Sequence, residues 1–76
     1  MSRLPIVGFR QIERVLHDLG SQAFRQKGSH VFYRHPDDRM TTVPNHPGRD
    51  LARPLIREIL RKIELTTEEF QKLLKL

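Results

Sequence analysis

The sequence contains no cysteine and no tryptophan, and none of its apolar runs is long. Without cysteine there can be neither a disulfide framework nor a thiolate metal site. No stretch approaches the roughly 20 apolar residues of a membrane span, and the first residues do not contain the apolar run of a secretory leader. We therefore expect a cytoplasmic protein. A length of 76 residues allows one domain, residues 1–76, with a small core.

Acidic residues are in the minority. Nine Asp and Glu stand against fourteen Lys and Arg, which gives a formal net charge of +5. A small basic domain favours an anionic partner, most often nucleic acid, although mild basicity also serves solubility alone. The four histidines do not have the paired spacing of a zinc finger or of an H-E-x-x-H helix. We therefore expect no metal and no other cofactor.

Hydrophobic periodicity predicts alternating helices and strands. Apolar residues at helical spacing predict one helix over residues 8–19 and another that opens near residue 50 and reaches residue 63. Between them, segments 21–27, 29–35 and 40–43 are separated by turn residues and predict three antiparallel strands. Thr66 and Glu69 have the spacing of a capping box that opens a last short helix.

The order α-β-β-β-α-α predicts an α+β fold, with a three-stranded antiparallel sheet packed on helices. The first helix has a weak start, because no Ser, Thr, Asp or Asn precedes it. One core should collect the apolar faces of these elements. Its expected members are Ile12, Val15, Leu16, Leu19, Val31, Tyr33, Val43, Ile56, Ile59, Leu60 and Ile63.

The stretch from Arg25 to Pro36 contains the residues that are best suited to catalysis and ligand binding. It predicts the end of one strand, a tight Gly-Ser turn, and a second strand on which alternate residues share one face. An imidazole exchanges protons near neutral pH, and cations beside it suit an anionic substrate such as a phosphodiester. We take His30 as the candidate catalytic residue. The candidates for substrate binding are Arg25, Lys27, Gly28, Ser29, Phe32, Arg34 and His35.

Each candidate also has an ordinary structural interpretation. An isolated histidine near a turn, such as His30, is usually a surface or hydrogen-bonded residue. Phe32 is either a stacking platform for a base or a strand aromatic packed against its neighbours. His35 either hydrogen-bonds the turn that follows it or acts as the acid that partners His30, a role for which water is the other candidate.

Taken together, these motifs resemble the HicA family of toxins from prokaryotic type II toxin–antitoxin systems. The resemblance runs from Leu4 to Phe70. It departs from the family at Val7, where a small polar residue is common, and at Ser21, where an aromatic is common. The matching motifs are Leu19-Gly20, Arg25-Gln26-Lys27-Gly28-Ser29-His30, Arg34-His35-Pro36, Thr42-Val43-Pro44 with His46, and Leu55-Ile56-Arg57-Glu58-Ile59-Leu60.

The resemblance implies a fold like a double-stranded-RNA-binding domain, with both main helices on one face of the sheet. It implies cleavage of mRNA, with His30, the histidine of the Gly-Ser-His motif, as the catalytic residue. It also implies a HicB-type antitoxin as the partner protein. Contact with DNA would be indirect, through the antitoxin complex.

Three functions remain open on the residues themselves. A metal-free ribonuclease would use His30 to take the proton from a ribose 2′-OH as that oxygen attacks the adjacent phosphate. A non-catalytic RNA-binding module would use the same basic face through shape and phosphate contacts. An interaction protein would use it only to engage another chain. RNA turnover distinguishes the first from the others, and salt-dependent RNA affinity distinguishes the second from the third.

Overall fold

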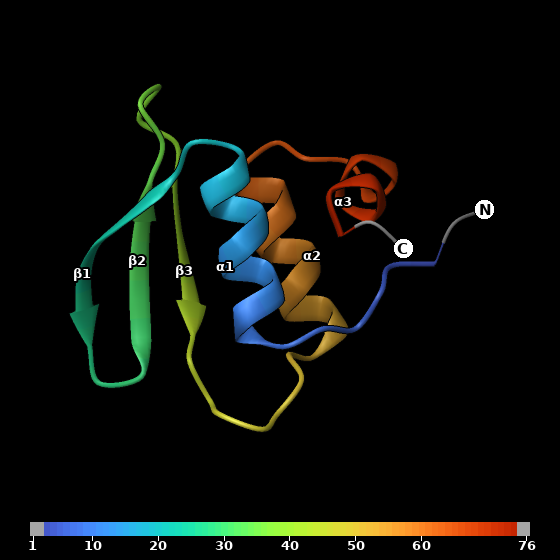
Figure 1. Cartoon of the computed structure of the whole chain (residues 1–76), viewed down its shortest axis with the longest axis horizontal. Coiled ribbons are helices and arrows are strands. Elements are labelled where there is room, and N and C mark those ends of the chain that lie inside the picture. Colours follow the sequence, from blue (N-terminus) through green and yellow to red (C-terminus); the bar gives the residue numbers. More distant parts are fainter. Residues whose placement is uncertain (1–2, 75–76) are drawn as a thin grey trace.

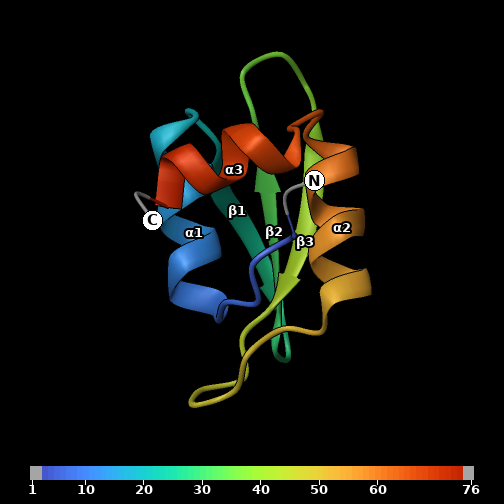
Figure 2. The ribbon, with the colours of Figure 1, turned by 90° about the vertical axis from the view of Figure 1, so that its right-hand side faces the viewer.

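The computed structural model describes residues 3–74, which form a three-stranded sheet with helices on one side. Figures 1 and 2 show three layers: the sheet, then α1 and α2 next to each other, then α3 across their outer side. The predicted α+β class and element order are confirmed. The elements are α1 (Phe9–Asp18), β1 (Gln22–Lys27), β2 (His30–Arg34), β3 (Met40–Pro44), α2 (Arg53–Lys62) and α3 (Thr67–Leu74).

The strands are antiparallel in the order β1-β2-β3, so β2 lies in the centre. β2 and β3 pair without interruption. Between β1 and β2 the register shifts, because Ala23 pairs with Tyr33 whereas Arg25 pairs with Phe32. Phe24 is therefore an extra residue that forms a β-bulge.

The helix ends show how nearby side chains set the boundaries. At α1, where the sequence predicts a weak start, the Gly8 amide donates to Oε1 of Gln11 at 2.9 Å. A side chain of the first turn thus supplies the bond that the preceding residues do not. At α3 the predicted capping box is confirmed: the Glu69 amide donates to Oγ1 of Thr66 at 3.1 Å, and the Thr66 amide donates to Oε1 of Glu69 at 2.9 Å.

The core lies between the sheet and the helices. All the predicted core residues belong to it, with Leu19 only half-buried at its edge. Leu4, Val7 and Leu51 are buried as well, although the sequence analysis did not include them. The reason is a contact between distant segments, since the Leu51 amide donates to the Val7 carbonyl at 2.8 Å. Within residues 3–74, no helix is both long and apolar enough to cross a membrane.

Candidate active site

The helices leave one side of the sheet uncovered (Figure 1), and the candidate residues of the strands lie on that side. Val31 and Tyr33 of β2 point toward the helices and are buried, so the alternate residues of that strand point the other way. Strand pairing adds their neighbours from β1 and β3. We call this surface the open face. Its residues are Gln22, Phe24, Arg25, Lys27, His30, Phe32, Arg34, Met40, Thr42 and Pro44.

His30 lies at one end of the open face, as the first residue of β2. Lys27 on β1 and Pro44 on β3 are its partners in register. Directly opposed residues have Cβ atoms about 4.5–5.5 Å apart, so the Lys27 ammonium can reach any group that contacts the imidazole. The His30 side chain is exposed, and no hydrogen bond or ion pair joins its ring to another residue between 3 and 74. The imidazole therefore has no partner within this part of the chain and lies exposed.

A tight turn positions His30. Gly28 has a φ of +59°, whereas Ser29 is outside the left-handed region, and this pattern is typical of a type II′ hairpin turn. The turn is held on both sides, because Nε2 of Gln26 donates to the Gly28 carbonyl at 3.1 Å and the Asn45 amide donates to the Ser29 carbonyl at 2.7 Å. The Gly-Ser-His motif therefore starts β2 with a histidine beside a fixed turn.

Two aromatic rings and two guanidinium groups form a cluster farther along the open face. The ring centroids of Phe24 and Phe32 are 6.4 Å apart, with their planes at 56°. The guanidinium carbon of Arg25 lies 5.7 Å from the Phe32 centroid, and that of Arg34 lies 5.0 Å from the Phe24 centroid. Both distances are within cation–π range. Sequence reasoning included three of these residues but not Phe24.

The strands carry positive charge only. None of the nine acidic residues of the chain lies in β1, β2 or β3, whereas Arg25, Lys27 and Arg34 do. Opposite charges attract over about 8–10 Å at ordinary ionic strength, so these three cations act together on a bound anion. The open face is suited to a phosphate backbone.

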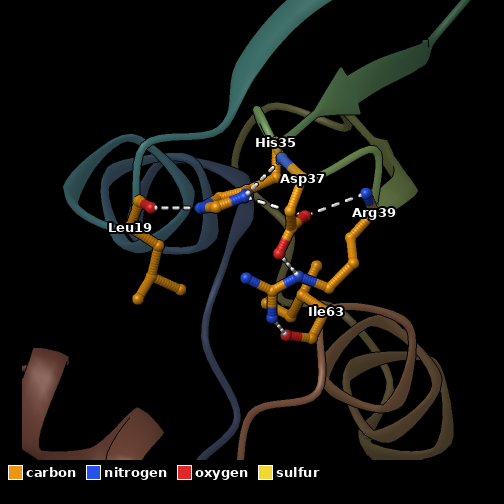
Figure 3. A network of polar contacts seen from close by, with 5 residues as sticks. All are labelled: Leu19, His35, Asp37, Arg39 and Ile63. Atoms are coloured by element: carbon orange, nitrogen blue, oxygen red, sulfur yellow. Dashed lines mark hydrogen bonds and ion pairs between the residues drawn. The ribbon is translucent and has the colours of Figure 1, made fainter.

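His35 lies beyond the opposite end of β2 from His30. Five residues at about 3.4 Å each put their Cα atoms roughly 17 Å apart. Its Nε2–H donates to the Leu19 carbonyl at 2.8 Å, and its Nδ1 accepts the Asp37 amide at 3.2 Å (Figure 3). The substrate-binding role of His35 stays a prediction, whereas a role as the acid that partners His30 does not fit this geometry. The local interpretation, a bond to the following turn, does.

His35 belongs to a polar network that joins the β2–β3 turn to the helices (Figure 3). Oδ1 of Asp37 lies 2.9 Å from Nδ1 of His35, and Oδ2 of Asp37 lies 2.7 Å from Nε of Arg39. Nη1 of Arg39 in turn donates to the Ile63 carbonyl, just after α2, while Leu19 follows α1. The Arg39 side chain, by hydrogen bonding, lowers the pKa of the Asp37 carboxyl to about 2. This network is structural.

An open groove lies beside the N-terminus of α1, at the same end of the molecule as the β1–β2 turn (Figure 1). Its volume is about 760 Å³, and the first turns of α1 and the loop between β3 and α2 line it. The lining includes two guanidinium groups, those of Arg10 and Arg49, and two carboxylates, those of Glu13 and Asp50. Because these charges balance, the groove gives an anion less attraction than the open face does.

Comparison with known protein families assigns the chain to a family. A family model described as "HicA toxin of bacterial toxin-antitoxin" matches residues 9–65, most of the 76-residue chain. The matched range contains α1, the whole sheet with the Gly-Ser-His turn, and α2. No curated protein matches the chain. The chain belongs to the HicA family of toxins from bacterial toxin–antitoxin systems.

Proposed function

We propose that the chain is a ribonuclease that cleaves mRNA, with His30 as its catalytic residue. The observation that carries the proposal is the exposed imidazole of His30, paired with Lys27 on strands that contain no acidic residue. Membership of the HicA toxin family supports it. His35, by contrast, uses both ring nitrogens in hydrogen bonds to its own chain.

The proposed reaction is an internal transesterification at a phosphodiester. Neutral His30 takes the proton of a ribose 2′-OH, and that oxygen attacks the adjacent phosphorus. The bond to the 5′-oxygen breaks, and this oxygen takes a proton from water, because His35 is engaged at the far end of β2. The products are a 2′,3′-cyclic phosphate and a 5′-hydroxyl. The Lys27 ammonium stabilises the charge that develops on the phosphorane oxygens.

The turn before His30 offers further phosphate contacts. Apart from Gly28 and its two chain neighbours, no heavy atom lies within 4 Å of the position that a Cβ atom of residue 28 would take, so there is space for a phosphate beside the backbone there. We assign Gly28 and Ser29 to the scissile phosphate, together with Lys27. We propose that the other candidates on the open face, Arg25, Phe32 and Arg34, contact the nucleotides on either side of that phosphate.

We further propose that a HicB-type antitoxin inhibits the toxin by covering the open face. An acidic or groove-filling surface placed over His30, Phe32 and Arg34 would keep RNA from the catalytic imidazole and satisfy the cations of the strands. Any contact with DNA would be made through the antitoxin. Amide chemical-shift mapping of the complex tests this proposal, with the largest changes expected in β1 and β2. Docking on α2 and α3 alone, with RNA access open, would contradict occlusion.

The ribonuclease proposal is tested by incubating the purified protein with a defined RNA in EDTA and identifying the new ends. Within residues 3–74, no three His, Asp or Glu side chains are arranged to hold a metal ion. Cleavage is therefore expected to persist in EDTA and to leave cyclic phosphate and 5′-hydroxyl ends. Tight RNA binding without any cleavage would favour the alternative function, a non-catalytic RNA-binding module.

A further inference from the structure

We propose that Phe24 and Phe32, flanked by Arg25 and Arg34, form a platform on which unpaired RNA bases stack beside the phosphate held at His30. The substrate would then be single-stranded at the cleavage site. This inference rests on the proposed ribonuclease function and extends it to the structure of the RNA.

The bulge in β1 is what brings Phe24 to the open face. With regular pairing between β1 and β2, Phe24 would stand opposite Tyr33 and share its inward direction. In the structure Ala23 takes that position, and Phe24 becomes the extra residue. Its ring lies next to that of Phe32, on the uncovered side. Bulges near sheet edges often re-aim a side chain beside a functional site.

The Phe24 side chain contributes little to the stability of the fold, because it is exposed. The side chain is 47% exposed, on an edge strand whose residues are all exposed. A phenylalanine stabilises a protein in proportion to the apolar area that it removes from water. Phe24 therefore gives only about half of the stabilisation that a fully buried phenylalanine would give. Phe32 is only partly buried as well. Proteins bind single strands by stacking bases on aromatic side chains, because every base has a π-face.

Arg25 and Arg34 supply charge where the backbone between stacked bases would run. Each guanidinium lies over an aromatic ring, and neither is ion-paired with an acidic side chain among residues 3–74. Guanidinium groups held in this way are available for bidentate contacts with phosphate. Phe32 is two residues from His30 along β2, a separation of about 7 Å. A nucleotide next to the one at His30 can therefore reach the platform.

A regular double helix cannot use this platform. Its bases are stacked on one another, and proteins contact duplex RNA through its shape, phosphates and 2′-hydroxyls. Charge alone fits an acidic protein partner equally well, so the test must separate base stacking from protein docking. The experiment must also measure RNA binding separately from RNA cleavage, because cleavage tests the ribonuclease proposal and binding tests the platform.

The experiment measures the affinity of labelled 2′-O-methyl RNA, which has no 2′-OH and cannot undergo the proposed reaction. The parent and His30→Ala are expected to bind a single strand more tightly than a perfect duplex of the same sequence. Phe24→Ala and Phe24→Leu should weaken single-strand binding about 5- to 150-fold, the usual range for one stacked base, and leave duplex binding unchanged. Ile6→Ala is the matched control, because Ile6 is 46% exposed on the N-terminal segment.

Phe24→Leu keeps an apolar side chain but removes the π-face, and circular dichroism checks that each variant is folded. Equal affinity for single strand and duplex, or single-strand binding that Phe24→Leu does not change, would overturn the platform. Phe24 variants that lose affinity only for a HicB-type antitoxin would assign the cluster to protein docking and overturn it too. A parent that binds single strands through Phe24 but never cleaves unmethylated RNA would refute the ribonuclease and leave the platform standing.

Discussion

Tyr33 provides a sensitive test of how the sheet packs on α1. The side chain is fully buried in the centre of the sheet, and its hydroxyl donates to Oε2 of Glu13 on α1. Burial, followed by the hydrogen bond and the charge of Glu13, raises the pKa of Tyr33 well above its ordinary value of 10.0. Tyr33→Phe removes the hydroxyl and its bond but leaves the ring in the core.

The expected loss follows from this geometry. A hydrogen bond to a charged group contributes about 1.5–3 kcal/mol, and the lower end applies because Glu13 is only partly buried. Above about pH 10, unfolded Tyr33 releases its proton while folded Tyr33 keeps it. The unfolded state then binds one proton fewer, so the unfolding free energy of the parent falls by about 1.4 kcal/mol per pH unit. The advantage of the parent over Tyr33→Phe should vanish near pH 11.

Urea unfolding of both proteins between about pH 8 and pH 11 measures this difference. A second readout is specific, because Tyr33 is the only tyrosine in the chain. Tyrosinate absorbance should therefore appear together with the loss of circular dichroism at high pH. An ordinary titration near pH 10 in a folded protein, or stability curves that stay parallel, would refute the burial of Tyr33 and its bond to Glu13.

Two other predictions concern the scaffold. Ile59 of α2 is 1% exposed, so Ile59→Ala should lower the free energy of unfolding in urea by about 2–5 kcal/mol, and an unchanged midpoint would contradict the packing of α2. Asp37, whose pKa Arg39 lowers to about 2, contributes stability that is complete above the unfolded value of about 3.9 and is lost as pH falls toward 2. The melting temperature of the parent should therefore approach that of Asp37→Asn over this interval, whereas equal pH slopes would show that the network does not stabilise the fold.

The features that could be predicted from the sequence depend on neighbouring residues. The capping box of Thr66 and Glu69 spans a single turn, and the alternation of Val31 and Tyr33 spans one strand. The hairpin that starts β2 at His30 follows from two turn residues. Each of these signals lies within a short stretch of the sequence. The element order and most of the core could therefore be predicted.

The features that were missed depend on contacts between distant segments. Phe24 reaches the open face only because β1 slips by one residue against β2, and no local pattern reveals a slip in register. Leu51 is buried because it pairs with Val7, far away in sequence. His35 is engaged by a carbonyl sixteen residues before it. Its place in the His-Pro motif predicts a contact with the substrate, whereas the bonds that it makes in the structure, to the Leu19 carbonyl and the Asp37 amide, were not all predictable from neighbouring residues.

The proposed ribonuclease depends on His30 as the group that transfers the proton in RNA cleavage. The most direct measurement is the single-turnover cleavage rate of His30→Ala, with affinity for 2′-O-methyl RNA measured alongside. The rate should fall about 10²- to 10⁴-fold. Affinity should change little, since several cations share the phosphate contacts, and the exposed side chain should leave folding intact. His17→Ala, which removes an exposed histidine of α1, should retain the parental rate. A folded His30→Ala variant that cleaves RNA at nearly the parental rate would contradict the account.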